Sequence, residues 1–207
     1  MLNSTQMYDA VRADSAHAAR APRQLGLMLA CVLLAVFCLT ALAGQSGSGQ
    51  ADLERNVKAA FLYKFLGYVD FPEAATPGQG EPLVIGILGA DGIADELSRI
   101  TLGRNMNGRA VVVRKLRQAD APGKLHLLFI GDEDAADTER ALAAVRQTPV
   151  LTVTETGRTL RADSVINFRV VDERVRFDVS LEAAEKNNLK LSSRLLAVAY
   201  KVERGGR

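Results

Sequence analysis

Leu83–Gly103 reads LVIGILGADGIADELSRITLG and decides the fold, because it places a strand directly before a helix. Leu83–Leu88 is a short apolar run of the kind that forms a buried strand. Asp91 can cap the helix that follows, and Gly103 can end it. The apolar face of that helix carries Ile93, Leu97 and Ile100. The stretch therefore predicts one strand–helix unit.

The same alternation continues toward the C-terminus. Further strands are expected at residues 110–116, 125–130, 150–154, 165–171 and 174–181, with Asp172-Glu173 as the hairpin turn between the last two. Helices are expected at residues 52–69 and 134–147, in a short segment up to Asn188, and from Ser192 or Ser193 to about Val202. This alternation implies an α/β fold: a mostly parallel central sheet of about six strands with helices on both faces, closed by a C-terminal antiparallel hairpin.

An uncharged apolar run, residues 25–43, precedes the predicted domain. Arginines lie before it, and it ends in Ala41-Leu42-Ala43, the small-x-small pattern of a signal-peptidase site. We expect an export signal that is cleaved between Ala43 and Gly44, which leaves a periplasmic mature chain. The alternative is an uncleaved membrane anchor, because the run is near the lower length limit of a spanning helix. The predicted divisions are a signal or anchor (1–43), a flexible linker (44–51, with Gln45–Gln50 reading QSGSGQ) and an α/β domain (52–202).

The composition excludes several classes of protein. Lys and Arg total 26 and Asp and Glu 24, so the net charge of +2 argues against nucleic-acid binding. The chain has 2 His and 2 Cys, too few for a Cys/His zinc module. Both cysteines lie inside the apolar run, so the mature chain would contain none. We expect no metal and no cofactor.

The patterns that suggest catalysis or ligand binding each have a simpler structural interpretation. Gly86-x-x-Gly89-x-x-Gly92 lies where a phosphate loop would, but its spacing fits only a tight turn between strand and helix. The acidic run at residues 132–137 suits the N-terminus of a helix. His126 has no second histidine in the mature chain, so a hydrogen-bonded histidine of the sheet is expected. Ser192-Ser193 suits a helix cap. The sequence thus predicts a protein without catalytic residues.

A basic cluster surrounds the second predicted strand. It consists of Arg104, Arg109, Arg114, Lys115 and Arg117. These residues form either the solvated edge of a strand or a docking patch for an acidic protein partner.

Six segments, taken in order, resemble the YfiR family. They are VKAAFLYKF (57–65) with YVDFP (68–72), LVIGILG (83–89), LLFIG (127–131), VLTVTE (150–155), VINF (165–168) with VRFDVSL (175–181), and LKLSSRLLAVA (189–199). The resemblance spans about residues 52 to 200. It implies a periplasmic α/β protein without catalytic activity that represses an inner-membrane diguanylate cyclase by binding the periplasmic part of that enzyme. It further implies an outer-membrane lipoprotein that relieves the repression, so that cyclic di-GMP and biofilm formation rise.

The resemblance singles out Asn167, Phe168, Arg176, Phe177, Ser192 and Ser193 as motif residues with a structural role or a place on the partner surface. We expect Ile166, Phe168, Phe177 and Leu181 in the core. Asn167 and Arg176 either pair across the hairpin or face a partner. The chain departs from the family because the predicted mature part contains no cysteine. We therefore do not expect redox control of its activity. The chain also has Asp163-Ser164 and Asn188 where the family often has glycine, and Asp and Asn tolerate unusual backbone angles.

Other functions remain open at this point. A periplasmic small-ligand sensor or carrier that acts through another membrane receptor would require a pocket at the strand ends. A hydrolase would require a nucleophile beside His126. The chain is also a possible homodimer.

Overall fold

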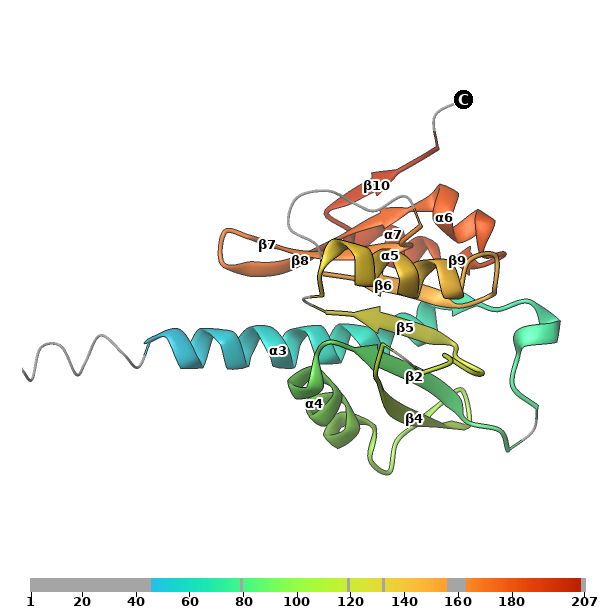
Figure 1. Ribbon diagram of the computed structural model, residues 1–207, viewed down its shortest axis with the longest axis horizontal. Coiled ribbons are helices and arrows are strands. Elements are labelled where there is room, and N and C mark those ends of the chain that lie inside the picture. Colours follow the sequence, from blue (N-terminus) through green and yellow to red (C-terminus); the bar gives the residue numbers. More distant parts are fainter. Residues whose placement is uncertain (1–45, 79, 119, 132, 156–162, 206–207) are drawn as a thin grey trace, which may run out of the picture. The chain divides into compact units, whose positions relative to one another are not determined.

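The computed structural model describes residues 46–205 except 79, 119, 132 and 156–162, and at residues 46–48 it describes only the backbone. Residues 51–207 make up one compact unit, which contains every strand of the described chain (Figure 1). The predicted signal or anchor and its cleavage site, Ala43-Gly44, lie outside the described residues. Within the described part of the chain, no helix has both the length and the apolar character to cross a membrane.

The unit is built on an eight-stranded sheet with the order β10-β8-β7-β6-β5-β2-β4-β3. The long strands are β2 (Leu83–Leu88), β4 (Arg109–Leu116), β5 (Leu127–Ile130), β6 (Leu151–Thr154), β7 (Ile166–Val171) and β8 (Arg174–Ser180), and the two outermost are β3 (Asn105–Met106) and β10 (Lys201–Glu203). Within this sheet, only β7–β8 and β3–β4 are antiparallel neighbours. The predicted α/β fold, with its mostly parallel sheet and C-terminal hairpin, is therefore confirmed.

Helices cover both faces of the sheet. Successive residues of a strand point to opposite faces, so a strand that is apolar throughout needs packing partners on both sides. On one face, α3 (Ser46–Phe65) and α4 (Asp91–Thr101) pack on Leu127 and Phe129 and their neighbours. On the other face, α5 (Ala135–Ala144) packs on Leu128 and Ile130. The C-terminal helices are α6 (Leu181–Lys186) and α7 (Ser193–Val198). Residues Leu66–Tyr68 and Glu73–Ala75 form short 3-10 helices, η1 and η2.

A small second ladder joins distant parts of the chain. Strand β1 (Val69–Asp70) pairs antiparallel with β9 (Lys190–Leu191). The backbone N–H of Ser192 also donates to the carbonyl of Tyr68 at 2.9 Å. The end of the first helical segment is thus held against the C-terminal segment.

The predicted cap of α4 is wrong. Asp91 is the first residue of this helix, and its N-cap is Ala90, whose side chain makes no capping hydrogen bond.

Three further local predictions are wrong. Helix α3 begins at Ser46, inside the predicted linker, because elongating an existing helix costs less than starting one and so extends into weak helix formers. The last helix ends at Val198, because the N–H of Tyr200 bonds to the Phe177 carbonyl and residues 201–203 then pair with β8. Leu181 starts α6 and is half-buried, since the strand ends at Ser180, whose hydroxyl caps that helix.

The apolar face of α3 also differs from the prediction. Leu53, Val57 and Phe61 are spaced four apart, which predicts one apolar face for the helix expected at residues 52–69, yet the side chain of Leu53 is 57% exposed. The buried positions are Lys58, Ala59, Leu62 and Phe65. The helix is therefore turned so that a lysine, rather than Leu53, faces the protein interior.

Candidate functional site

The three glycines of the candidate phosphate loop have structural roles, and a Cβ on the third, Gly92, would lie 2.9 Å from Nε of Arg55. Gly86 lies in the middle of β2, where a Cβ would come within 2.7 Å of Leu116 and 2.9 Å of Leu125. Gly89 ends the strand with φ +67°, a backbone angle that favours glycine. A Cβ on Gly131 would lie 2.7 Å from the Gly89 carbonyl oxygen. The strand order reverses between β2 and β5, and α/β sheets commonly bind nucleotides in the crevice at such a point. Here the backbone at Gly89 and the backbone at Gly131 lie too close together to leave a crevice.

His126 is a structural residue of the sheet. It immediately precedes β5 and is 2% exposed. Its Nδ1 accepts the backbone N–H of Val84 at 2.9 Å, and its ring meets Phe71 edge to face at 5.7 Å between centroids. Burial lowers the pKa of His126, which favours the neutral ring that this hydrogen bond requires. The predicted hydrogen-bonded histidine is what the structure contains.

Among the residues that the structure describes, no cluster of His, Cys, Asp or Glu is suited to hold a metal ion. Ser192 is the N-cap of α7, and its Oγ accepts the N–H of Arg194 at 3.2 Å. Ser193 is the first residue of that helix and is exposed. The cap is therefore Ser192, one of the two alternatives that the sequence left open.

Two of the predicted motif residues belong to an aromatic cluster. Phe168 of β7 and Phe177 of β8 lie opposite each other in the hairpin and are 1% and 2% exposed. Both contact Phe61 and Phe65 of α3, with the closest ring centroids, those of Phe65 and Phe177, 5.0 Å apart. This cluster seats α3 on the C-terminal hairpin, and its residues are core as expected.

Asn167 and Arg176 do not lie opposite each other, which excludes one of the two alternatives, a pair across the hairpin. Asn167 is buried opposite Asp178, and its Oδ1 accepts the hydroxyl of Thr154 at 3.0 Å. Arg169 supplies the charge partner on the hairpin, with its Nη1 2.9 Å from Asp178. Arg176 lies opposite Arg169 and is exposed. Within this motif, Arg176 is thus available to a partner, whereas Asn167 is not.

Among the residues that replace family glycines, only Asn188 has a left-handed backbone conformation. Asn188 follows α6 in the left-handed region with φ +53°, as its residue type allows. Asp163 and Ser164 do not need such angles. Asp163 pairs with Arg146 at 2.6 Å, and the buried Ser164 donates its hydroxyl to the Ile166 carbonyl at 2.8 Å.

An ion-pair cluster that the sequence pattern does not predict holds α3 to the end of β6. The side chain of Lys58 is 5% exposed and forms ion pairs with both Glu54 and Glu155. Glu54 lies one turn earlier on α3, and Glu155 directly follows β6. We call this cluster the Lys58 clamp. The Glu54–Lys58 spacing in the sequence was a signal for the local pair, but the contact with Glu155 depends on the tertiary fold.

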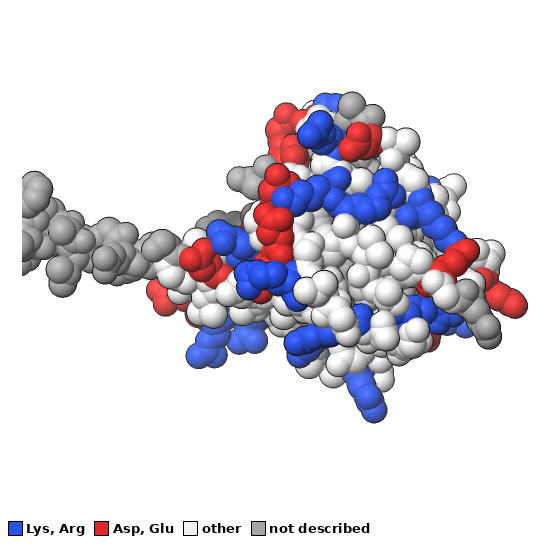
Figure 2. All heavy atoms as spheres, turned by 90° about the horizontal axis from the view of Figure 1, so that it is seen from below, with Lys and Arg blue, Asp and Glu red and all other residues white. Residues whose placement is uncertain are grey.

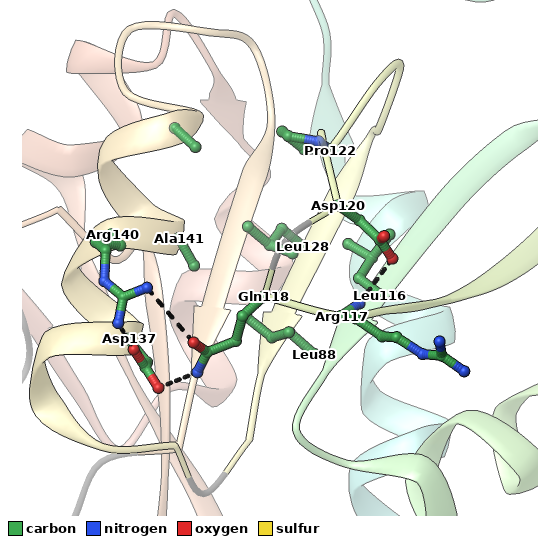
Figure 3. Close-up of a pocket in the computed structure, with 11 residues that line it drawn as sticks. Leu88, Leu116, Arg117, Gln118, Asp120, Pro122, Leu128, Asp137, Arg140 and Ala141 are labelled. Carbon is green, nitrogen blue, oxygen red and sulfur yellow. Dashed lines mark hydrogen bonds and ion pairs between the residues drawn. The ribbon is translucent and has the colours of Figure 1, made fainter.

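A small cavity lies at the carboxyl ends of β2 and β4, beside α5 (Figure 3). Its volume is about 110 Å³. Leu88, Leu116 and Leu128 line its apolar side. The side-chain amide of Gln118 faces Asp137 and Arg140 of α5 (Figure 3). Its Nε2 donates to Asp137, and its Oε1 accepts from Arg140 Nη1 at 3.5 Å. Typical ligand pockets measure roughly 300–1,000 Å³, so this cavity fits only a very small molecule.

The basic cluster lies along β4, next to the edge of the sheet. Figure 2 views the molecule from this side and shows Lys and Arg side chains around an uncharged area. Arg109 is half-buried and donates to the Pro77 carbonyl at 2.9 Å, and Lys115 pairs with Asp95 of α4 at 2.8 Å. Arg104, Arg114 and Arg117 are exposed, and none forms an ion pair with another described residue. Both readings of the cluster, a strand edge and an accessible basic surface, are therefore compatible with its position.

Comparison with known protein families agrees with this arrangement. The model of the family described as YfiR/HmsC-like matches residues 55–200, and the chain belongs to that family. The match includes α3 from its middle onward, the whole sheet except β10, and α7. Membership suggests a non-catalytic, periplasmic regulator of diguanylate cyclase signalling.

Proposed function

We propose that this YfiR/HmsC-like protein is a negative regulator of an inner-membrane diguanylate cyclase and binds the periplasmic part of that enzyme. The observation that carries the proposal is the family match over residues 55–200. The structural roles of His126, Ser192, Gly86 and Gly89 support a binding protein rather than an enzyme.

The regulator would act by selecting one state of the cyclase. A bound protein shifts a two-state equilibrium only by its difference in affinity for the two states, and a tenfold difference corresponds to about 1.4 kcal/mol. Preferential binding to the inactive state therefore lowers cyclic di-GMP. An outer-membrane lipoprotein that binds the regulator would reverse the effect by mass action, because it lowers the concentration of free regulator.

Deletion of the gene tests the proposal. Cellular cyclic di-GMP is expected to rise in the deletion strain and to return to the starting level when the full chain is supplied from a plasmid. Biofilm formation should follow the same order. Cyclic di-GMP that stays constant after deletion, in every growth condition in which the protein is made, would refute regulation of a cyclase.

Export can be tested separately. The N-terminus of the protein recovered from the periplasm is expected to be Gly44, because the Ala41-Leu42-Ala43 end fits the cleavage site. Ala43→Leu should block cleavage and leave the chain in the membrane fraction, whereas Ala35→Leu, inside the apolar run, should not. Uncleaved wild-type protein in the membrane would instead support an anchor.

A second candidate function, a small-ligand sensor, rests on the cavity beside Gln118 and Arg140. Ala141→Leu should fill that cavity, since Ala141 lies on its wall (Figure 3). If the protein senses a ligand there, the variant will still regulate cyclic di-GMP but will no longer respond to changes in the medium that alter wild-type regulation. An unchanged response would exclude this cavity as the sensor.

A further inference from the structure

Strand β4 has a long free edge. On its inner side, residues 111–116 pair with β2 along their whole length. On its outer side, β3 covers only Arg109 and Ala110. No strand of the described chain pairs with the outer side of residues 111–116. A free edge of this length is a template for an added strand.

The pairing on β2 determines which of its backbone groups face β4. The carbonyls of Val84 and Leu88 accept the N–H groups of His126 and Gly131, each at 2.9 Å, so Val84 and Leu88 face β5. Backbone groups alternate between the two sides of a strand. Ile85, which lies between them at the alternate position, therefore faces β4.

The same alternation identifies the outward-facing groups of β4. Ile85 lies opposite Val113, and in a parallel ladder a residue bonds to the two neighbours of the residue it faces. Those neighbours, Val112 and Arg114, thus face β2. The backbone N–H and C=O groups that point outward belong to Val111, Val113 and Lys115.

A groove runs beside this free edge. It lies between the C-terminal end of α4 and β4, has a volume of about 480 Å³, and is lined by Thr101, Leu102, Arg104, Val111 and Val113 among others. Leu102 is 83% exposed and Val112, whose side chain lies on the opposite face of β4, is 40% exposed. An added strand would thus find apolar contacts for side chains on both of its faces.

The charge around the edge is positive and only partly compensated. Lys115 has a carboxylate partner in Asp95, but Arg104 and Arg114 have none among the described residues. Arg117, which follows the strand, has none in that part of the chain either. Pairing this edge with a second copy of itself would place like charges opposite one another, which is destabilising. An acidic strand would instead meet complementary charge.

We propose that the outer edge of β4 binds an extended, acidic segment of the partner protein as an additional strand of the sheet. Backbone bonds to Val111, Val113 and Lys115 hold the segment, and Arg104 and Arg114 attract its carboxylates. The proposal rests on the proposed function, because it assigns a surface and a chemistry to the same partner.

The test in cells uses the deletion strain and full-length variants. Arg104→Glu/Arg114→Glu reverses the two unpaired charges and should leave cyclic di-GMP at the level of the deletion strain. Arg194→Glu changes an exposed arginine on α7 and should restore regulation as the wild type does. If deletion raises cyclic di-GMP but both variants restore it, the edge proposal is wrong and the proposed function stands. If deletion changes nothing, the proposed function fails, and the edge proposal depends on the test with the purified protein.

The proposed backbone hydrogen bonds of Val111, Val113 and Lys115 are tested with protein purified in the form that the cell produces. The probe is a peptide of alternating valine and glutamate, and the matched control has lysine in place of glutamate. The acidic peptide should slow amide hydrogen exchange at Val111, Val113 and Lys115, bind more weakly as salt rises, and bind roughly tenfold more weakly to the double variant. Lys115→Pro removes one outward N–H and should also weaken binding, whereas Lys115→Ala keeps that N–H and should bind more tightly than Lys115→Pro.

Several results would overturn the proposal. Equal binding of the two peptides would show that charge does not select the occupant. Unchanged exchange at the three amides, with or without binding, would exclude the edge. Slow exchange there in the absence of peptide, together with a dimer in solution, would assign the edge to a second copy of the chain.

Discussion

Replacing Lys58 by methionine should destabilise the protein more than any exposed ion pair would suggest. Lys58 is 5% exposed and is paired with Glu54 and Glu155, whose side chains are 27% and 32% exposed. Lys58→Met keeps an unbranched apolar stem but leaves two carboxylates beside each other. Breaking a buried ion pair costs about 3–5 kcal/mol, and because water reaches both carboxylates we expect about 2–3 kcal/mol.

A double-mutant cycle separates the charge effect from lost packing. Glu155→Gln alone should cost about 1 kcal/mol, since Lys58 keeps Glu54 as a partner. Combined with Lys58→Met, Glu155→Gln should cost nothing further or restore stability, because the repulsion between the carboxylates disappears. Free energies of unfolding come from urea titrations of the three variants and the wild type. Additive costs, or a loss below about 0.5 kcal/mol for Lys58→Met, would refute the Lys58 clamp as a determinant of stability.

Three further predictions concern single positions. Burial lowers the pKa of His126, so the contribution of this residue to the free energy of unfolding should be fully present above about pH 6.5. Below that pH the free energy of unfolding should decrease by at most about 1.4 kcal/mol per pH unit. His126→Asn keeps an acceptor for the Val84 N–H but does not titrate, so equal pH slopes for the two proteins would contradict this. Asn188→Ala should cost about 1 kcal/mol in thermal unfolding, whereas Asn188→Gly should cost nothing, because Asn188 is exposed and left-handed; equal costs would rule out the backbone as the cause. Gly131→Ala should cost about 1–3 kcal/mol in urea, since its Cβ would meet the Gly89 carbonyl; an unchanged midpoint would show that the two loops separate easily.

The sequence was sufficient to predict the main elements, because their patterns are local. Leu83–Leu88 and Asp91–Thr101 are recognised from apolar spacing and both lie where expected, although the N-cap of the helix is Ala90 and not Asp91. Short elements that depend on pairing were missed. Lys201–Glu203 has no pattern of its own and becomes a strand because β8 offers it a free edge. Leu53 was assigned to the buried face of α3 by spacing alone, but the Phe61–Phe177 contact and the Lys58 clamp orient that helix.

The same distinction applies to the candidate site. Ser192 was recognisable as a cap from residue type, and Phe168 and Phe177 as core from alternation. The register that places Asn167 opposite Asp178 follows from the predicted two-residue turn at Asp172-Glu173, because turn length fixes the pairing of a hairpin, and a pair between Asn167 and Arg176 was never compatible with that turn. The basic residues of β4 were visible in the sequence. That they border a free edge and a groove follows only from the strand order.

The pairing of β1 with β9 has a consequence for the order in which the chain folds. Val69 lies opposite Leu191, and the aromatic partners of α3 are Phe168 and Phe177. Part of the surface on which α3 packs, including Leu127 and Phe129, comes earlier in the chain, but its aromatic partners on the hairpin are made only near the C-terminus. Contacts of such long sequence separation slow folding. The packing of α3 is therefore complete only when the C-terminal hairpin and β9 are in place.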